Sequence, residues 1–599
     1  MNNKISEDKI LFLKNRALNL AIDSIRSTTQ AGSGHPTSCL SAADLISVIF
    51  FNELKYDLKN PKNPNNDRFI LSKGHAAPVL YAAWKQLGVI SDEELMSLRK
   101  FDSVLEGHPT RRFEYNEAAT GSLGQGLAIG VGMAMNAKMD KLDYTTYVFM
   151  GDGEIAEGSV WEAASLASHY KLDNLIGIID CNKLGQTGST LHADNEEEYA
   201  KKFEAFGWQS FVIGGHDTEQ ILKTYKKIDI LRKQGESRPF VIIAKTHKGF
   251  GLTSVQDKNG FHGKPFSKNE VEKLITQLKD KFPEAALFKT EKKYVPASPK
   301  KVKDKKHEKV SLDLQKDRNS SLFDIGQQMA TRKAFGYALT AIGKIEQDLV
   351  VLDGDVKNST FTEIFEEVFP DRFIQCFIAE QAMIGIATGF DARGKISFSA
   401  TFAAFLTRAF DQLRMAAIGK NSLRLCGSHV GVSIGQDGPS QMGLEDIAMF
   451  RTLPNSVILY PCDGVSAYKL VEQMANYHDG ISYIRTTRPK TPVIYDKDEK
   501  FEIGGCKVLS KNNNDKVCLI GAGITLHEIM KSYEKLKDKT INVSMIDLYS
   551  IKPLDVETIS RIAKESNNKI ITVEDHYLDG GLGQAVSSAL INEDIKVYN

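Results

Sequence analysis

Short runs of β-branched and aliphatic residues, separated by helical patterns, constrain the fold of this chain more than any other feature. In its first half, such runs predict strands at 68–72, 147–150, 175–180 and 240–244. A helix is expected from about Ala77 to Gln86. The runs lack the apolar–polar alternation of a half-exposed strand, which is typical of strands buried on both faces. They therefore predict a parallel sheet covered by helices.

The same pattern recurs twice more along the chain. Further strands are predicted at 349–355, 373–377, 423–426, 457–460, 517–523, 542–547 and 569–573. We therefore predict an α/β protein with three consecutive parallel or mixed sheet domains flanked by helices. The predicted domains are 1–285, 326–490 and 491–599, joined by a linker at 286–325 that contains a basic, core-poor run at 298–309. The chain stops directly after a predicted strand, so we expect the last domain to continue past Asn599.

Composition and charge exclude several classes of protein. Lys and Arg number 76, as do Asp and Glu, so the chain has no global attraction to nucleic acid or to an anionic membrane. A membrane helix needs about 18 consecutive apolar residues, and no run in this sequence is that long. The N-terminus contains acidic residues and lacks the apolar core of a signal peptide. The seven cysteines form no C-x-x-C pair, which argues against a disulfide framework or a zinc site. We predict a cytoplasmic protein with reduced thiols.

A Gly-Asp-Gly sequence at 151–153 ends one predicted strand, and Asn182 follows the next strand. Neighbouring parallel strands end at the same edge of a sheet, where ligands bind. Asp152, Asn182 and a carbonyl near Leu184 could therefore ligate one hard cation, Mg²⁺ or Ca²⁺ rather than zinc. The helix expected near Glu157 would offer amide groups to a diphosphate. Gly-Asp-Gly alone is also typical of a strand-ending turn; together with Asn182 it matches the thiamine diphosphate motif.

Several of the 13 histidines lie beside glycine or proline at strand–helix junctions: His35, His75, His108, His262 and His429. A single loop histidine is commonly a surface or capping residue. Five in such positions suit the recognition of sugar hydroxyls and proton exchange near neutral pH. They lack the i, i+4 spacing of a metal-binding helix.

Glu380 comes shortly after the strand predicted at 373–377. Burial at this position would disfavour the charged carboxylate, so the side chain could hold or share a proton. Activation of an aminopyrimidine ring requires such a group. A lone glutamate at a helix start can equally be a cap. Phe402 and Phe405 could stack on a pyrimidine or pack in a core.

The motifs quoted above belong to a larger set at 31–37, 120–126, 151–154, 248–249, 262–265, 379–381, 437–441 and 573–577. At these residues the chain resembles the transketolase family, in its compact animal-type form, over nearly its whole length. The resemblance implies a homodimer that binds thiamine diphosphate and Mg²⁺ (or Ca²⁺). The diphosphate and metal would bind domain 1–285, and the pyrimidine ring would bind domain 326–490 of the other subunit, so active sites would lie at the subunit interface.

The resemblance also implies roles for individual residues. Metal ligands would be Asp152, Asn182 and the carbonyl of Leu184. The cofactor would be lined by Lys73, His75, Gly121, Leu123, Gly153, Gln186, Lys248, His262, Phe402 and Phe405. Glu380 would hydrogen-bond the pyrimidine, with Glu157 and Glu162 as its partners across the interface. His35, His108 and His262 would move protons. Sugar phosphates would bind to His35, His262, Arg332, Ser359, His429, Asp437, Gln441 and Arg488.

The implied reaction transfers a two-carbon ketol unit from xylulose 5-phosphate to ribose 5-phosphate or erythrose 4-phosphate, in the non-oxidative pentose phosphate pathway. Three alternatives stay open. Deoxyxylulose-phosphate synthase shares the cofactor and domain order, but it uses pyruvate and would not need all these histidines. Dihydroxyacetone synthase is separable only by kinetics. An inactive transketolase-like protein would have lost Glu380, Asp152 or Asn182, and all three are present. An NAD-dependent dehydrogenase is excluded because the glycines at 121–126 lack the G-x-G-x-x-G spacing.

Overall fold

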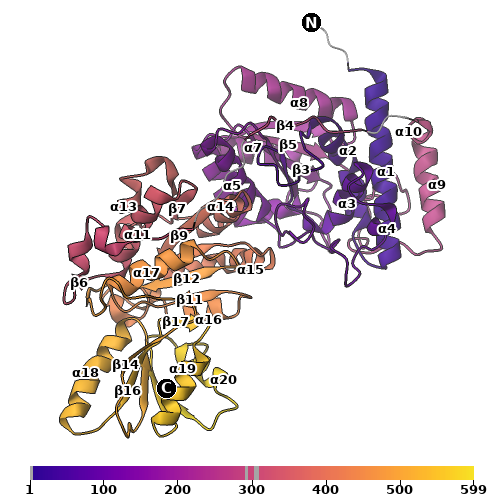
Figure 1. The fold of residues 1–599 in the computed structure, drawn as a ribbon. Helices are drawn as coiled ribbons and strands as arrows, with labels where there is room; N and C mark the ends of the chain where they lie inside the picture. The colour runs from indigo at the N-terminus through magenta and orange to yellow at the C-terminus, as the bar shows by residue number, and fades with distance from the viewer. Residues whose placement is uncertain (1–4, 290–293, 303–308) are drawn as a thin grey trace. The chain divides into compact units, whose positions relative to one another are not determined.

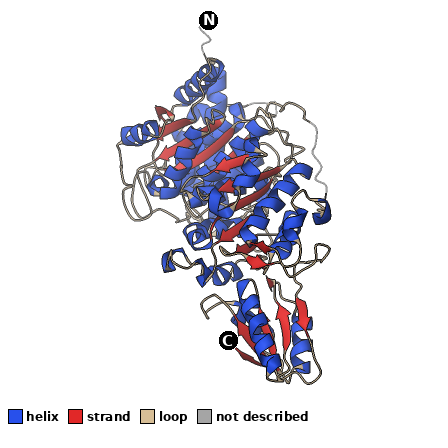
Figure 2. Ribbon diagram, turned by 90° about the vertical axis from the view of Figure 1, so that its left-hand side faces the viewer, coloured by secondary structure: helices blue, strands red, loops and turns tan. Residues whose placement is uncertain are grey.

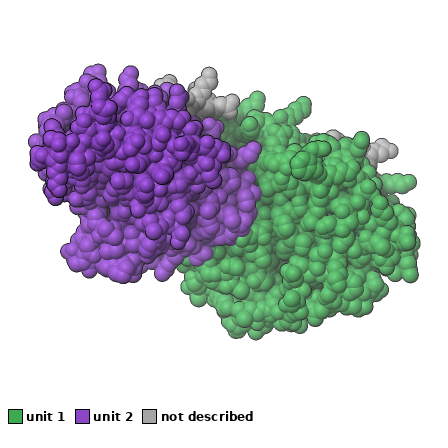
Figure 3. Space-filling model, turned by 90° about the horizontal axis from the view of Figure 1, so that it is seen from below, with its two compact units in different colours: residues 1–304 green, residues 305–599 purple. Residues whose placement is uncertain are grey.

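A computed structural model describes residues 5–289, 294–302 and 309–599. The chain divides into two compact units, Met1–Asp304 and Lys305–Asn599, which Figure 3 colours separately. They are called the first and second units below, and each is described by itself. The strands form the sheets, and helices pack against the faces of these sheets (Figure 2). The predicted α/β class with parallel or mixed sheets is confirmed.

The first unit contains one fully parallel sheet, with strand order β1-β2-β3-β5-β4. Its strands are β1 (Arg68–Leu71), β2 (Thr146–Gly151), β3 (Leu175–Cys181), β4 (Gln209–Gly214) and β5 (Phe240–Lys245). Four were predicted within one or two residues. The fifth, β4, was missed because it is an edge strand whose residues are mostly half-buried, so it lacks a continuous apolar run.

The helices of the first unit pack around this sheet (Figure 1). They are α1 (Glu7–Ala31), α2 (Pro36–Val48), α3 (Ala77–Gln86), α4 (Asp92–Leu95), α5 (Gly126–Met139), α6 (Gly158–His169), α7 (Glu196–Ala205), α8 (Thr218–Lys233), α9 (Val271–Lys281) and α10 (Pro283–Leu287). Helix α3 has the predicted bounds. Helix α1 packs along α2 and also contacts α9 and α10. Its first turn is capped by Ser6, whose hydroxyl accepts the amide of Lys9.

The second unit has a seven-stranded sheet of order β17-β11-β12-β10-β9-β7-β8, parallel except for β17. These strands are β7 (Leu349–Asp353), β8 (Phe373–Gln375), β9 (Ile396–Phe402), β10 (Arg424–Ser428), β11 (Val457–Leu459), β12 (Ser482–Thr486) and β17 (Ser550–Lys552). A short pair, β6 (Gln328–Met329) and β13 (Thr491–Pro492), lies beside it. Strands β9, β12 and β17 were not predicted. In β9, Ser397, Ser399 and Thr401 imitate a half-exposed strand, although all three are buried.

A further sheet of order β14-β16-β15-β18-β19 completes the second unit, with β14 antiparallel. Its strands are β14 (Lys507–Ser510), β15 (Cys518–Gly521), β16 (Ser544–Asp547), β18 (Lys569–Val573) and β19 (Lys596–Tyr598). Strand β17 leaves this region and pairs with β11 of the preceding sheet. A buried ion pair adds a second link, because Arg485 contacts both Asp446 and Asp575. The C-terminal region is thus joined to the seven-stranded sheet by strand pairing and by this ion pair.

The helices of the second unit include several that carry predicted site residues. They are α11 (Thr331–Ile345), α12 (Lys357–Thr360), α13 (Glu363–Glu366), α14 (Glu380–Ala392), α15 (Phe410–Ile418), α16 (Asp446–Arg451), α17 (Gly464–Ala475), α18 (Ile524–Asp538), α19 (Val556–Glu565) and α20 (Leu582–Ala589). The 3-10 helix η7 (Ala403–Ala409) follows β9 directly.

Two local predictions differ from the structure. The strand expected at 373–377 ends at Gln375, because Phe377 has a φ of 54°, a left-handed value that breaks a strand. The segment expected to be a linker contributes Val310, Leu314 and Phe323 to the core of the second unit. The basic run at 298–309 lies partly outside the described residues, which omit 303–308. Within the described parts of the chain, no helix is both long and apolar enough to cross a membrane.

Candidate active site

A cavity of about 490 Å³ opens at the carboxyl edge of the parallel sheet in the first unit. Loops after four parallel strands supply most of its polar side chains, as expected for a ligand site in this type of sheet, and the junction of α1 and α2 adds His35 and Ser38. The predicted residues that line it are His35, Lys73, His75, His108, Gly121, Leu123, Asp152, Gly153, Asn182, Leu184, Gln186, Lys248 and His262. Glu157 does not line it. This residue is the exposed N-cap of α6, and Glu162 lies within that helix.

Three histidine rings meet in this cavity. The ring centroids of His35, His75 and His262 are 5.0 to 5.1 Å apart, and His108 lies 6.2 Å from His35. Burial, followed by the neighbouring His262 and His108, lowers the pKa of His35 to about 3. Burial and the Lys248 ammonium lower the pKa of His262 to about 4. The rings are therefore neutral at pH 7, and each offers one donor and one acceptor to a hydroxyl-rich ligand.

Arg99, which was not predicted, ties two of these histidine loops together. Its Nη1 donates to Ser33 Oγ at 2.7 Å and its Nη2 donates to the Gly107 carbonyl at 3.4 Å. These groups lie two residues before His35 and one before His108. No sequence motif marks Arg99, because its two partners are brought together only by the fold.

Lys73 is held by Asp180, a second residue that the sequence analysis did not single out. Lys73 Nζ lies 2.6 Å from Asp180 Oδ2, and both side chains are buried. Ser41 and Thr246 also donate their hydroxyls to Asp180. Burial tends to raise the pKa of Asp180, but the ammonium and hydroxyls outweigh it and the pKa is lowered. The signal was present in the sequence, because Asp180 falls at the end of a predicted strand.

The predicted metal ligands present an oxygen-rich donor set. Asp152 follows β2 and Asn182 follows β3, so both lie at the same sheet edge. The carbonyl of Leu184 also lines the cavity, where it accepts from Lys248 Nζ at 2.7 Å. Burial, and then Asp180, raises the pKa of Asp152. Carboxylate, amide and carbonyl oxygens are the ligands that Mg²⁺ and Ca²⁺ prefer, so the donor set fits a hard divalent cation.

The same cavity contains polar atoms without partners. His35 Nδ1 and Ser38 Oγ are buried and make no hydrogen bond to any described residue. Such atoms carry a desolvation penalty that a bound polar ligand would relieve. Gly121 has a φ of 130°, and a side chain there would lie 2.9 Å from His108. Glycine is therefore required at this position, because a side chain would collide with His108 in the wall of the cavity.

Glu154 shapes the floor of the cavity. The carboxylate is buried and accepts the amides of Gly124, at 2.8 Å, and Gly151, at 3.0 Å. Ser72 donates its hydroxyl to the same group. Glu154 thereby holds together the loops after β1 and β2 and the start of α5. It belongs to the quoted motif at 151–154, but no role was predicted for it.

A second group of predicted residues meets in the second unit. Arg332 Nη1 donates to the Ser359 carbonyl at 2.6 Å, and Arg488 Nη1 lies 3.1 Å from Asp437 Oδ2. Burial, followed by the charges of Arg332 and Arg488, lowers the pKa of His429 to about 3. Two guanidinium groups beside a neutral imidazole form a site suited to a phosphate. Gln441 hydrogen-bonds to Ser440, and no contact among the described residues places it in this group.

Aromatic residues lie beside this anion site. Phe402 and Phe405 are stacked with centroids 5.2 Å apart, and Phe402 also stacks on His429 at 4.0 Å. Glu380 is the first residue of α14 and is 3% exposed. The Glu380 carboxylate lies 4.0 Å from Arg408 of η7, the 3-10 helix that also carries Phe405. These residues could hold a flat heterocycle with a polar edge.

Comparison with known proteins identifies the family. Three family models match in order: the transketolase thiamine diphosphate binding domain at 13–328, the transketolase pyrimidine binding domain at 327–493 and the transketolase C-terminal domain at 505–598. The chain belongs to the transketolase family. It is 48% identical to human transketolase over 594 residues, covering 98% of this chain and 92% of that protein. Mouse transketolase-like protein 2 is 46% identical over 592 residues, with the same coverage.

Solved transketolase structures share the fold. The crystal structure of Campylobacter jejuni transketolase superposes with a TM-score of 0.80 and 25% identity, covering 99% of this chain and 95% of that one. The resemblance seen in the sequence is confirmed, and so is the prediction of a transketolase-type transferase. The thiamine diphosphate-binding domain of the transketolase fold contains the histidine-lined cavity, and its pyrimidine-binding domain contains the arginine pair.

Proposed function

We propose that this transketolase moves a two-carbon ketol unit from xylulose 5-phosphate to ribose 5-phosphate or erythrose 4-phosphate, the exchange used in the non-oxidative pentose phosphate pathway. The observation that carries the proposal is the group of neutral histidines in one cavity with the oxygen donors Asp152 and Asn182. A pyruvate-condensing synthase has no need for so many groups that recognise hydroxyls. The cytoplasmic location expected from the sequence stays a prediction.

The cofactor assignment rests on the two groups of residues. Thiamine diphosphate, when bound, supplies the electron sink for breaking the carbon–carbon bond of the ketose. We propose Asp152, Asn182 and the Leu184 carbonyl as ligands for Mg²⁺ or Ca²⁺. Residues proposed to line the diphosphate and thiazolium are Lys73, His75, Gly121, Leu123, Gly153, Gln186, Lys248 and His262. This assignment is supported because all of these residues line one cavity, which also contains the unpartnered atoms His35 Nδ1 and Ser38 Oγ.

Glu380 is proposed to hold the proton that the aminopyrimidine ring nitrogen shares, and Phe402 and Phe405 to pack against that ring. The position of Glu380 supports this role, because it is the buried first residue of α14 and lies close to the helix that carries Phe405. Glu157 and Glu162 are proposed to approach Glu380 from the partner subunit.

The substrate is proposed to bind through its two ends. Arg332, Ser359, His429 and Arg488 would hold the phosphate, with Asp437 and Gln441 reading a hydroxyl. His35, His108 and His262 would donate and accept hydroxyl protons as the carbonyl carbon changes geometry. Neutral imidazoles can do both without a permanent charge in the cavity.

A homodimer is proposed, with each active site made by the diphosphate-binding part of one chain and the pyrimidine-binding part of its partner. We retain the expected divisions at 1–285, 326–490 and 491–599 as functional domains. The packing of Val310, Leu314 and Phe323 places the end of the linker 286–325 in the core of the second unit.

The proposal is tested by a coupled assay with xylulose 5-phosphate and ribose 5-phosphate, with and without thiamine diphosphate and Mg²⁺. Release of glyceraldehyde 3-phosphate that needs cofactor, metal and ribose 5-phosphate is the expected result. If the protein binds the cofactor but releases none, the ketol transfer proposal fails. Pyruvate and formaldehyde then test the two synthase alternatives, and failure with both indicates an inactive transketolase-like protein.

A further inference from the structure

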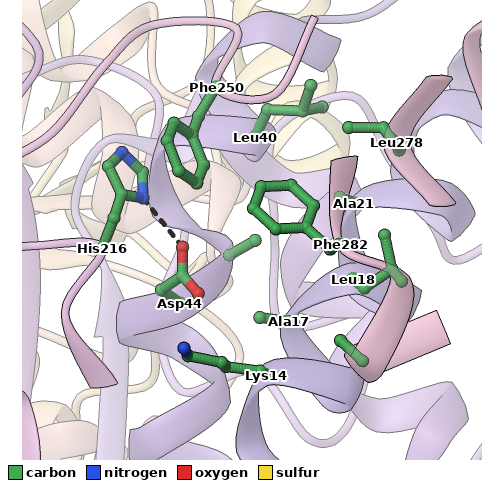
Figure 4. Close-up of a pocket in the computed structure, with 12 residues that line it drawn as sticks. Lys14, Ala17, Leu18, Ala21, Leu40, Asp44, His216, Phe250, Leu278 and Phe282 are labelled. Carbon is green, nitrogen blue, oxygen red and sulfur yellow. Dashed lines mark hydrogen bonds and ion pairs between the residues drawn. The ribbon is translucent and has the colours of Figure 1, made fainter. Parts of the chain in front are cut away.

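A second cavity in the first unit has no part in the proposed reaction. Its volume is about 110 Å³, and it lies between α1, α2 and the α9–α10 pair (Figure 4). Its walls are largely apolar: Leu18 from α1, Leu40 from α2, Leu278 from α9, and the rings of Phe250 and Phe282. For comparison, an engineered cavity of about 150 Å³ holds benzene. The cavity is therefore of the right size for a branched group of about four carbons.

One wall of this second cavity carries an ordered polar pair. His216 Nδ1 lies 2.8 Å from Asp44 Oδ2 (Figure 4), and His216 Nε2 accepts the His247 amide at 3.0 Å. A ring nitrogen that accepts an amide carries no proton, so His216 donates through Nδ1 to Asp44. The Phe250 ring stacks on His216 with centroids 3.5 Å apart. Asp44 thus already accepts a hydrogen bond from His216.

The charge left over beside this cavity is positive. Lys14 lines the cavity, is exposed, and makes no ion pair with any described residue. Lys281 stands over the Phe250 ring at 5.4 Å and, among the residues described, also lacks an ion pair. Apolar walls with free ammonium groups at the edge complement an amphipathic anion.

We propose that this second cavity is a binding site for a small branched aliphatic carboxylate. Its apolar chain would lie among Leu18, Leu40 and Phe282, and its carboxylate would pair with Lys14. An alcohol would gain no ion pair. An amine would be repelled by Lys14 and would find Asp44 already hydrogen-bonded to His216, so the carboxylate is the chemistry that the charges select.

The second cavity is also connected to the active-site cavity along the chain. Lys248 follows His247, whose amide is held by His216. Lys248 Nζ contacts His262 Nδ1 at 2.7 Å and the Leu184 carbonyl at 2.7 Å. A carboxylate packed against Phe250 would steady this turn, because ligand binding to the folded form suppresses local opening. The site therefore binds a ligand that acts on the position of Lys248.

The test uses 4-methylpentanoate as the probe, titrated into the full-length protein by calorimetry without substrates. The alcohol and the amine with the same carbon chain are the matched ligands. We expect saturable millimolar binding of the acid only. Lys14→Gln should weaken it about fivefold, the size of one partly exposed ion pair. Lys9→Gln, on the same helix but outside the cavity, should leave binding unchanged.

A second variant and a second readout sharpen the test. Ala17→Leu fills the cavity and should abolish binding, whereas Ala205→Leu, exposed at the end of α7, should not. Hydrogen exchange of the amides at 247–250 should slow when the acid binds. Equal binding by Lys14→Gln, equal binding of the alcohol or amine, or no saturation overturns the site. Binding that leaves exchange at 247–250 unchanged overturns the coupling. Neither result depends on the ketol transfer assay.

Discussion

At the residue scale, the active-site cavity is defined by side chains whose ordinary charges are suppressed or paired. Four imidazoles are held neutral by burial and by nearby cations, while Lys73 is neutralised by Asp180. The arrangement gives a cavity with many hydrogen-bonding groups and little free charge besides Lys248 and Asp152. Such a site can recognise hydroxyls and still leave room for a charged diphosphate and its cation.

Arg99 makes the first prediction at this scale. Burial comes first and the Arg99 charge second in lowering the pKa of His108, and the same charge contributes at His35. Replacing Arg99 by Met should raise both pKa values toward their ordinary range. Each imidazole would then take up a proton at a higher pH, so activity should fall off earlier as the pH is lowered.

The measurement is the pH profile of kcat and of kcat/KM for Arg99→Met and Arg99→Lys. The lysine variant keeps the charge, so it should keep the profile while losing the bidentate clamp on Ser33 and Gly107. Arg112→Met, which removes an exposed partner of Glu106, is the control. An unshifted acid limb in Arg99→Met contradicts an electrostatic role.

His429 makes the second prediction, on stability. Its pKa is lowered to about 3 in the folded protein, whereas the unfolded chain binds the proton near pH 6.5. Between these values the unfolded state holds more protons, so this residue destabilises the fold increasingly as the pH drops below about 6.5.

Removing the His429 imidazole should therefore reduce the loss of stability that occurs as the pH is lowered. We expect His429→Gln to lose less of its apparent melting temperature between pH 7 and pH 5 than the wild type does. His169→Gln, at an exposed position on α6, should behave as the wild type. An identical pH dependence in His429→Gln and the wild type would contradict the buried neutral imidazole.

At the element scale, close packing of helices decides where side chains are tolerated. Helix α11 approaches the loop before α13 so closely that a methyl group on Gly336 would lie 2.3 Å from the Phe361 carbonyl oxygen. The obstacle is backbone, which cannot rotate away. In α6, by contrast, a methyl group on Gly158 would meet nothing within 4 Å. Two helical glycines thus have opposite constraints.

The matched pair gives the third prediction. Gly336→Ala should destabilise the second unit by about 1–3 kcal/mol, the usual penalty of overpacking, even though alanine is the better helix former. Gly158→Ala should be neutral or stabilising by up to about 1 kcal/mol. Thermal unfolding of both variants checks this, and equal melting temperatures would contradict the close approach of α11.

At the scale of the whole molecule, the two groups of site residues belong to different compact units. If each active site combines parts of two chains, then Asp152→Ala and Glu380→Ala should complement each other in mixed dimers. One site of the mixed dimer would carry both substitutions, and the other would carry neither. This is the fourth prediction.

Co-expression of the two inactive variants should restore about a quarter of the wild-type activity, since half of randomly assorted dimers are mixed and each has one intact site. Asp152→Ala paired with Asn182→Ala is the control, because both substitutions fall in the same unit and leave no intact site. Absence of recovery with the first pair, in dimers shown to be mixed, would mean that each chain forms its own site.

Much of this molecule is determined locally by its sequence. A buried parallel strand needs an apolar run, and its end needs a turn, so the sequence alone suffices to place Asp152 and Asn182 at one sheet edge. The glycine-flanked histidines follow the same logic, since each lies in a loop that begins or ends an element. Strand β9 escaped because alternating serines imitate exposure, and burial depends on what packs on them.

The tertiary structure alone decided which side chains meet across long sequence separations. Arg99 reaching Ser33, Lys73 reaching Asp180, and Arg332 meeting Ser359 have no local signature, because hydrogen bonds between distant residues depend on how whole elements pack. The second cavity beside Lys14 is likewise a product of packing between α1, α2 and α9. Sequence specifies elements through short-range conformational preferences, whereas pairing and cavities arise from long-range packing that only the folded chain sets.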